Sequence, residues 1–166
     1  HVKRLSAAGI QSAFQFYIIN SFETVERLIR RGVYKGPLVC NWVAIGGGMD
    51  QPTIYSLAHF LRAMPDGAML TVESSMRNVL PINMMGLAMG LHVRCGIEDN
   101  LWNQSRTAKM STVEQIEQLA DLVDSYDVDV YAFGLATDFR ARLFPAAQRL
   151  FELADETGKS SAFASS

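Results

Sequence analysis

The stretch G-L-H-V-R-C-G-I-E-D-N at residues 90–100 decides the fold assignment, because it has the pattern of a strand that ends in polar side chains. From Leu91 to Ile97 every second residue is apolar or cysteine, so this set is expected on one face of a strand, under covering helices. The opposite face then carries Arg94 and Glu98, which are costly to bury unless they are paired or bind a ligand. Asp99 follows in the adjoining loop.

Three similar units precede this stretch. Short runs rich in aromatic and β-branched residues predict strands at 14–19, 38–45 and 68–72, and helical spacing of apolar residues follows each of them. A capping box at Ser111–Glu114 predicts the start of a further helix, and Thr137 is a candidate cap for a last one. Four strands that alternate with helices predict parallel pairing through helical crossovers.

Two architectures fit four such units: a small open α/β sheet, or half of a (β/α)8 TIM-type barrel, which as a whole needs roughly 250 residues. The helix-like stretch at 1–8 begins without a capping residue, which favours a partial barrel. We therefore predict an α/β fold with four parallel βα units over residues 1–154. The small, polar residues 155–166 are expected to form a flexible tail.

The composition argues against several classes of protein. The chain has 166 residues, 49% hydrophobic and 19% charged, with a net charge of −2. No apolar run is long enough to cross a bilayer, no signal-peptide pattern is present, and no basic stripe suggests nucleic acid. Cys40 and Cys95 lie in apolar runs without metal-type spacing and are expected as buried, reduced thiols. These features predict a cytoplasmic protein.

The carboxyl ends of parallel strands meet at one edge of a sheet, where active sites of such folds lie. There, Glu98 could bind a divalent cation or act as a base, Arg94 could hold a substrate carboxylate, and Asp99 could move a proton. The alternative is an Arg94–Glu98 ion pair that only fills the interior. His92, deeper in the strand, is expected to be a hydrogen-bonded core residue.

Other candidates lie at the same edge. The glycines at 46–48 allow backbone N–H groups to approach an anion, although the pattern also fits a plain flexible turn. Ser75 is a candidate substrate contact, and Glu73, Ser74 and Arg77 are further polar candidates for the rim. Gln15 and Asn41 are expected to line the interior. The histidines form no HxH or HExxH motif, so this chain alone makes no His-rich metal site.

Residues 90–100 resemble the signature G-G-H-V-R-V-G-L-E-D-N of the β-keto acid cleavage enzyme family, with conservative changes at Leu91, Cys95 and Ile97. Weaker resemblance extends to residues 108–116 and 136–142, so that most of residues 1–143 is covered. The family consists of zinc-dependent barrel proteins, and the covered part is the C-terminal half of that barrel.

The resemblance implies that a β-keto acid and acetyl-CoA are converted into acetoacetate and a new acyl-CoA. Glu98 would be the carboxylate that binds Zn²⁺, while Arg94 and Asp99 would support deprotonation and orient the reacting groups. Gly46, Gly47, Gly48 and Ser75 would contact the substrate. The remaining zinc ligands of the family are histidines on an early strand outside this chain, which implies a homo-oligomer or pairing with an N-terminal half.

Two departures from the family pattern keep other functions open. Ser12-Ala13-Phe14-Gln15 replaces the family's Pro-Glu-x-Glu, and residues 73–77 replace a glycine-rich strand end. One alternative is therefore a non-catalytic homologue that binds a CoA ester or a carboxylate. Another is an α/β scaffold whose copies pair through their open strand edges, or an incomplete barrel without activity.

Overall fold

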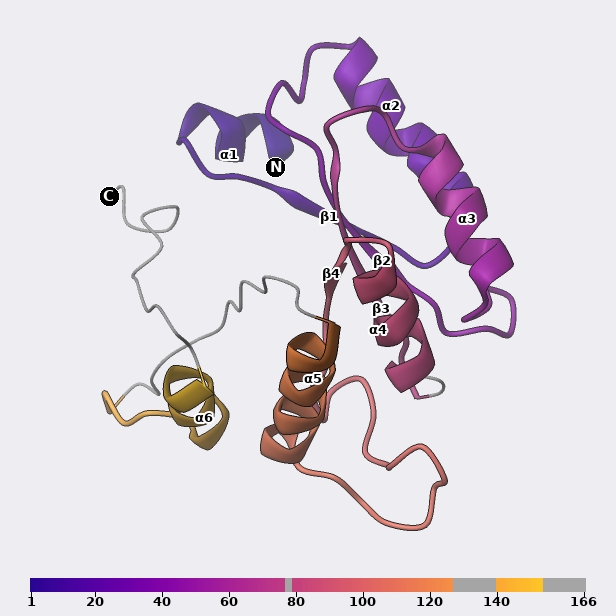
Figure 1. The fold of residues 1–166 in the computed structure, drawn as a ribbon. Coiled ribbons are helices and arrows are strands. Elements are labelled where there is room, and N and C mark those ends of the chain that lie inside the picture. Colours follow the sequence, from indigo (N-terminus) through magenta and orange to yellow (C-terminus); the bar gives the residue numbers. More distant parts are fainter. Residues whose placement is uncertain (77–78, 127–139, 154–166) are drawn as a thin grey trace.

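A computed structural model describes residues 1–76, 79–126 and 140–153 of the chain (Figure 1). The predicted tail at 155–166 and the proposed cap at Thr137 lie outside the described residues. The elements, in chain order, are α1 (Val2–Ala7), β1 (Ala13–Phe16), the 3-10 turn η1 (Ile19–Ser21), α2 (Phe22–Arg30), β2 (Val39–Val43), α3 (Ile54–Ala63), β3 (Met69–Glu73), α4 (Val79–Ala88), β4 (His92–Val93), α5 (Thr112–Tyr126) and α6 (Pro145–Leu153).

The four strands form one sheet in the order β1-β2-β3-β4, and every neighbouring pair is parallel. Helices α2, α3 and α4 connect successive strands, as parallel pairing requires. The predicted α/β class and the four parallel strands are confirmed. Within the described ranges β1 and β4 are the two edge strands, so the sheet is open.

One face of the sheet forms the core together with α2 and α3, which lie side by side in Figure 1. Phe16 and Trp42 point into this core with at most 2% of their surface exposed. Phe22 from α2 and Phe60 from α3 meet there, with ring centroids 6.0 Å apart. Burying each side chain of this size contributes about 1.5–3 kcal/mol, so this layer supplies much of the stability.

The other face of the sheet carries a row of polar side chains. Backbone register places Gln15, Asn41, Thr71 and His92 next to one another across the four strands. Gln15 and Asn41, which were expected to line the interior, therefore lie on the same face of the sheet. The prediction that His92 is a hydrogen-bonded core residue is wrong for the described chain, because the residue is exposed.

Helix α4 packs closely on β3 and β4 through Gly86. A Cβ atom at this position would lie 2.5 Å from Val72 Cγ2 and 2.8 Å from Val93 Cγ1. These distances are shorter than ordinary van der Waals contacts, so only glycine allows this approach of helix and sheet. The contact fixes the distance between α4 and β4, and the polar segment 94–99 follows directly after β4.

Strand β4 is shorter than predicted, since it covers only His92–Val93 and not residues 91–97. Gly96, with φ 151°, leaves the strand direction and donates its N–H to Gln115 Oε1 at 3.0 Å. Ile97 N–H is directed to Thr112 Oγ1 in the same way. The first turn of α5 therefore replaces β3 as the partner, and Ile97, predicted on the covered face, is half exposed.

Helix α5 begins as the sequence predicts. Ser111 N–H donates to Glu114 Oε2 at 2.7 Å, and Glu114 N–H donates to Ser111 Oγ at 3.2 Å, which is a capping box. An ion pair of 2.8 Å between Arg149 and Glu117 joins α6 to α5.

Both cysteines are free thiols; Cys40 is fully buried and Cys95 is half-buried. Burial raises the pKa of each thiol to about 11, so neither is a reactive thiolate near neutral pH. No helix in the described part of the chain has the length and apolar character to cross a membrane.

Candidate functional site

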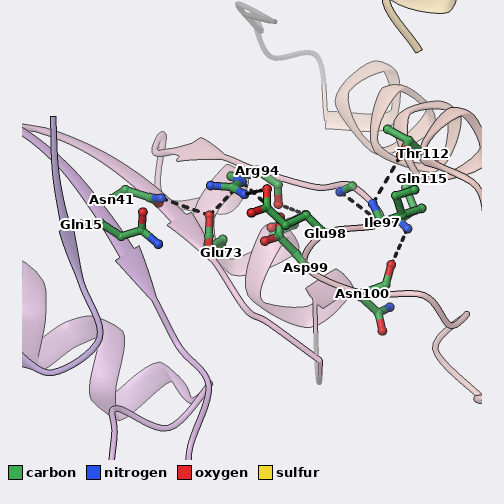
Figure 2. Close-up of polar contacts among 12 residues, drawn as sticks. Gln15, Asn41, Glu73, Arg94, Ile97, Glu98, Asp99, Asn100, Thr112 and Gln115 are labelled. Carbon is green, nitrogen blue, oxygen red and sulfur yellow. Dashed lines mark hydrogen bonds and ion pairs between the residues drawn. The ribbon is translucent and has the colours of Figure 1, made fainter. Parts of the chain in front are cut away.

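Three carboxylates surround the Arg94 guanidinium at the carboxyl ends of β3 and β4 (Figure 2). Nε of Arg94 lies 3.1 Å from Glu73 Oε2 and 3.1 Å from Asp99 Oδ2. Its Nη2 donates to Glu98 Oε2 at 2.7 Å. Glu73 is the last residue of β3, while Glu98 and Asp99 lie in the turn after β4. The sequence-predicted residues Arg94, Glu98 and Asp99 are thus brought together.

Burial divides the cluster into an inner and an outer side. The side chains of Glu73 and Asp99 are 2% and 4% exposed, whereas that of Glu98 is 85% exposed. Arg94 lies between them with 34% of its side chain exposed. Among the residues that the structure describes, Nη1 of Arg94 has no hydrogen-bond acceptor. The guanidinium therefore has a held edge and an edge open to a ligand.

The backbone around the cluster is held by side-chain amides. Asn83 Nδ2 on α4 donates to the carbonyl oxygen of Arg94 at 3.2 Å. Gln115 on α5 accepts from Gly96 N–H and donates to the carbonyl oxygen of Asn100 at 2.8 Å, so it spans the turn that carries the two acids. A backbone bond from Met76 N–H to the Asp99 carbonyl oxygen joins this turn to the end of β3.

The cluster holds more negative than positive charge. Burial raises the pKa of the Glu73 carboxyl above its usual range, and the Asp99 charge adds to the effect, although the Asn41 hydrogen bond and the Arg94 charge oppose it. Burial likewise raises the pKa of Asp99; Arg94 opposes this shift and the Glu98 charge adds to it. Two buried carboxyls beside one guanidinium can thus hold and release a proton more readily than exposed ones.

These raised pKa values make stability depend on pH. The folded chain retains protons on Glu73 and Asp99 at pH values where the unfolded chain has lost them, so the free energy of unfolding falls as pH rises through this range. We expect Asp99→Asn to reduce this fall, which begins as pH rises above about 4, the ordinary pKa of an aspartyl carboxyl. Urea unfolding of both proteins across the range measures the difference, and parallel curves would contradict the assignment.

The predicted glycine loop follows β2. Gly46 has φ 89° and Gly47 has φ 70°, both in the left-handed region that favours glycine. Gly46 N–H already donates to the Asp50 carbonyl oxygen at 2.9 Å, so only Gly47 and Gly48 remain as candidate anion donors. The loop is further closed by Trp42 Nε1, which donates to Asp50 Oδ2 at 2.8 Å.

Ser75 is half-buried in the segment after β3, two residues beyond Glu73. Within the described residues no hydrogen bond joins Ser75 or the glycine loop to Arg94. The structure therefore places these candidates at the same sheet edge but does not connect them to the charged cluster. Their role as substrate contacts stays a prediction.

The donor set fits part of a metal site. Glu98 offers an exposed carboxylate at the sheet edge, but no group of three His, Cys, Asp or Glu side chains suited to a metal ion occurs among the described residues. Catalytic zinc sites use three protein ligands. These residues alone do not complete a zinc site.

Glu73 is the member of the cluster for which the sequence predicts a place but no partner. It is a candidate for the rim of the site at the end of the third strand, and its contact with Arg94 is not predicted. The pairing of β3 with β4 brings it beside Arg94, and this neighbour relation depends on strand order. A carboxylate that ends one strand beside a strand carrying arginine is the signal that would have identified it.

Comparison with known proteins assigns this arrangement to a family. The sequence profile described as beta-keto acid cleavage enzyme matches residues 1–138, which include the sheet and the whole charged cluster. The chain belongs to this family. The predicted resemblance is therefore confirmed.

A curated relative within the family is the 3-keto-5-aminohexanoate cleavage enzyme of Acetoanaerobium sticklandii. It is 25% identical over 119 residues, which make up 71% of this chain and 43% of the relative. The chain thus spans less than half the length of this relative.

A shorter likeness connects the chain to another class of protein. A segment of 48 residues is 62% identical to thymidine kinase of Streptomyces coelicolor and 54% identical to that of Cutibacterium acnes. It covers 29% of this chain and 22% of each kinase. Since the family profile runs to residue 138 of 166, any such segment shares residues with it. This likeness shows a shared segment and does not show membership of the kinases.

Proposed function

We propose that the chain forms part of a β-keto acid cleavage enzyme that uses acetyl-CoA as co-substrate. In this reaction the acyl group of the β-keto acid passes to the CoA sulfur, and the acetyl group passes to the remaining carboxymethyl carbon. Acetoacetate and a new acyl-CoA form without oxidation or reduction. One observation carries the proposal. The guanidinium of Arg94 is partly exposed and lies beside two buried acids, within the segment matched to the family.

Arg94 is the proposed binding group for the carboxylate of the β-keto acid. Its Nη1 has no acceptor among the described residues, and its side chain is one-third exposed. A guanidinium binds a carboxylate through two parallel N–H groups, which fixes the orientation of the acid as well as its position. The substrate carbon next to that carboxylate would then lie near the buried acids.

Asp99 is the proposed proton carrier. A general base must reach the proton that it removes, and its pKa must lie near the working pH. Asp99 is almost fully buried and next to Arg94, and burial raises the pKa of its carboxyl toward that range. Its carboxyl would hold the proton removed from the carbon beside the substrate carboxylate.

We further propose Zn²⁺ as the metal of the complete site, with Glu98 as one ligand. The exposure of Glu98 and its position at the sheet edge support this role. The other ligands would come from residues beyond those described. Bound there, zinc would supply Lewis-acid polarisation of the keto oxygen.

The proposal includes the architecture around the site. We infer that the four-stranded sheet is the C-terminal half of a (β/α)8 barrel, whose interior is lined by the polar row on the sheet. The open edges at β1 and β4 support this inference, since a barrel pairs both. An N-terminal half or a second copy would supply the missing strands, and a cytoplasmic location is expected.

The proposal is tested with the chain in its complete assembly, in which a second copy or an N-terminal half supplies the missing strands, loaded with zinc and mixed with acetyl-CoA and a panel of β-keto acids. Acetoacetate release is the expected result. Glu98→Ala is expected to lose the bound zinc measured by atomic absorption, while Glu23→Ala on α2 retains it. Unchanged zinc content in Glu98→Ala would overturn the ligand assignment.

A second function, binding of a carboxylate or CoA ester without catalysis, is favoured by one observation. Gln15 on β1 donates to Tyr17 and provides no carboxylate where the family sequence pattern has one. If the zinc-loaded chain binds acetoacetate but releases no product from any β-keto acid, this second function replaces the first.

A further inference from the structure

Glu73 has no role in the function proposed above, yet its surroundings are unusual. It is 1% exposed, and its side chain lies on the polar face of the sheet and not in the apolar core. Its Oε2 accepts a hydrogen bond of 3.1 Å from Asn41 Nδ2 and lies 3.1 Å from Arg94 Nε. Burial of a carboxylate costs free energy unless contacts with the protein replace its lost contacts with water. The contacts with Asn41 and Arg94 compensate for this cost.

Neutralisation of Arg94 does not require Glu73. Asp99 and Glu98 already provide two negative charges within 3.1 Å of the guanidinium, so a third carboxylate makes the cluster more negative than balance requires. The geometric effect of Glu73 is different. It lies on β3, a strand that is paired on both sides, whereas Glu98 and Asp99 both belong to the turn after β4. Glu73 therefore anchors Arg94 to a second element of the fold.

We propose that Asn41 and Glu73 form a positioning pair that holds the Nε edge of Arg94 and so aims its open Nη1 edge at the substrate carboxylate. This inference rests on the proposed function for the identity of the substrate. The pair runs across three neighbouring strands, from Asn41 on β2 through Glu73 on β3 to the residue after β4. Without it, the remaining acidic partners of Arg94, Asp99 and Glu98, would both belong to the turn after β4.

Asn41 sets the position of Glu73 in turn. Its Nδ2 donates to the same oxygen that faces Arg94, so the carboxylate is held from one side and directed to the other. Glu73→Gln keeps the shape of the side chain and its carbonyl oxygen but removes the charge. Asn41→Ala keeps the charge of Glu73 and removes the hydrogen bond. The two variants therefore test the same pair from opposite ends.

The test uses the full chain labelled with ¹⁵N, in which the Nε–H signal of Arg94 is assigned by its loss in Arg94→Lys. Glu73→Gln is expected to speed hydrogen exchange of this N–H by about tenfold, because a charged partner is lost. Asn41→Ala is expected to have a smaller effect in the same direction. Glu23→Gln, which removes an exposed partner of Arg27 on α2, is the control and leaves the Arg94 signal unchanged.

The second readout separates positioning from a purely structural role. Glu73→Gln is expected to raise the KM for the β-keto acid, or the Kd for acetoacetate, by about tenfold with a smaller change in kcat. The proposal would be overturned if both variants kept the native hydrogen-exchange rate of Arg94 Nε–H and the native affinity for acetoacetate. Absence of turnover in the complete assembly would instead count against the proposed function, because the Arg94 signal is measured without catalysis. Should Glu73→Gln fail to fold, Asn41→Ala decides the question.

Discussion

Arg94→Lys is expected to lower kcat/KM for β-keto acid cleavage by about 10²- to 10³-fold. Lysine keeps the positive charge between Glu73 and Asp99, so the buried acids remain neutralised and the fold is retained. The ammonium group cannot contact the inner acids through one edge and offer two parallel N–H groups to a substrate through another. The loss should therefore appear in substrate binding and orientation, and not in stability.

Acetoacetate release and urea unfolding, measured on the same preparation, test this expectation. Arg27→Lys on α2 is the matched control, because Arg27 also pairs with a glutamate but at an exposed site far along the chain. It should leave both quantities unchanged. Activity of Arg94→Lys within threefold of the native chain would show that the guanidinium of Arg94 does not bind the substrate through two parallel N–H groups.

Gly86→Ala is expected to lower the free energy of unfolding by about 1–3 kcal/mol. Two effects oppose each other, since alanine favours a helix over glycine by about 1 kcal/mol. Steric overlap dominates, because the added Cβ would lie 2.5 Å from Val72 Cγ2 and 2.8 Å from Val93 Cγ1, both on strands that pack against α4. Relief of the overlap requires α4 to move away from the sheet and leaves part of the core poorly packed.

Chemical denaturation gives the difference directly, and Met84→Ala on the same helix is the control. Met84 is partly exposed, so its truncation should change stability by no more than about 0.5 kcal/mol. A Gly86→Ala chain as stable as the native one would mean that α4 approaches the sheet less closely than the structure shows. The same displacement would shift β4, so a modest loss of activity should accompany the loss of stability.

The sequence was sufficient to predict the first three strands, because their side chains meet local conditions. Phe16 and Val72 alternate with polar or exposed neighbours, and they lie under helices whose spacing is also visible in the sequence. The capping box before α5 involves residues three apart, so no distant contact was needed to recognise it.

The end of β4 was not predictable in this way. Alternation continues in the sequence through Ile97, but Gly96 and Ile97 direct their N–H groups to Gln115 and Thr112 on α5. Such a long-range contact leaves no trace in local periodicity. The exposure of His92 and the contact between Glu73 and Arg94 likewise depend on strand order and on which face the helices cover.

The hydrogen bond from Trp42 to Asp50 gives the protein an internal optical reporter. The indole of Trp42 is fully buried and bonded to the residue that closes the glycine loop, whereas Trp102, the other tryptophan, is 40% exposed. Emission from the two rings should differ in wavelength and in access to a soluble quencher. The fluorescence that acrylamide does not quench therefore comes from Trp42 and reports on the loop at 46–48. A rearrangement of this loop on ligand binding can be followed in real time without an added dye.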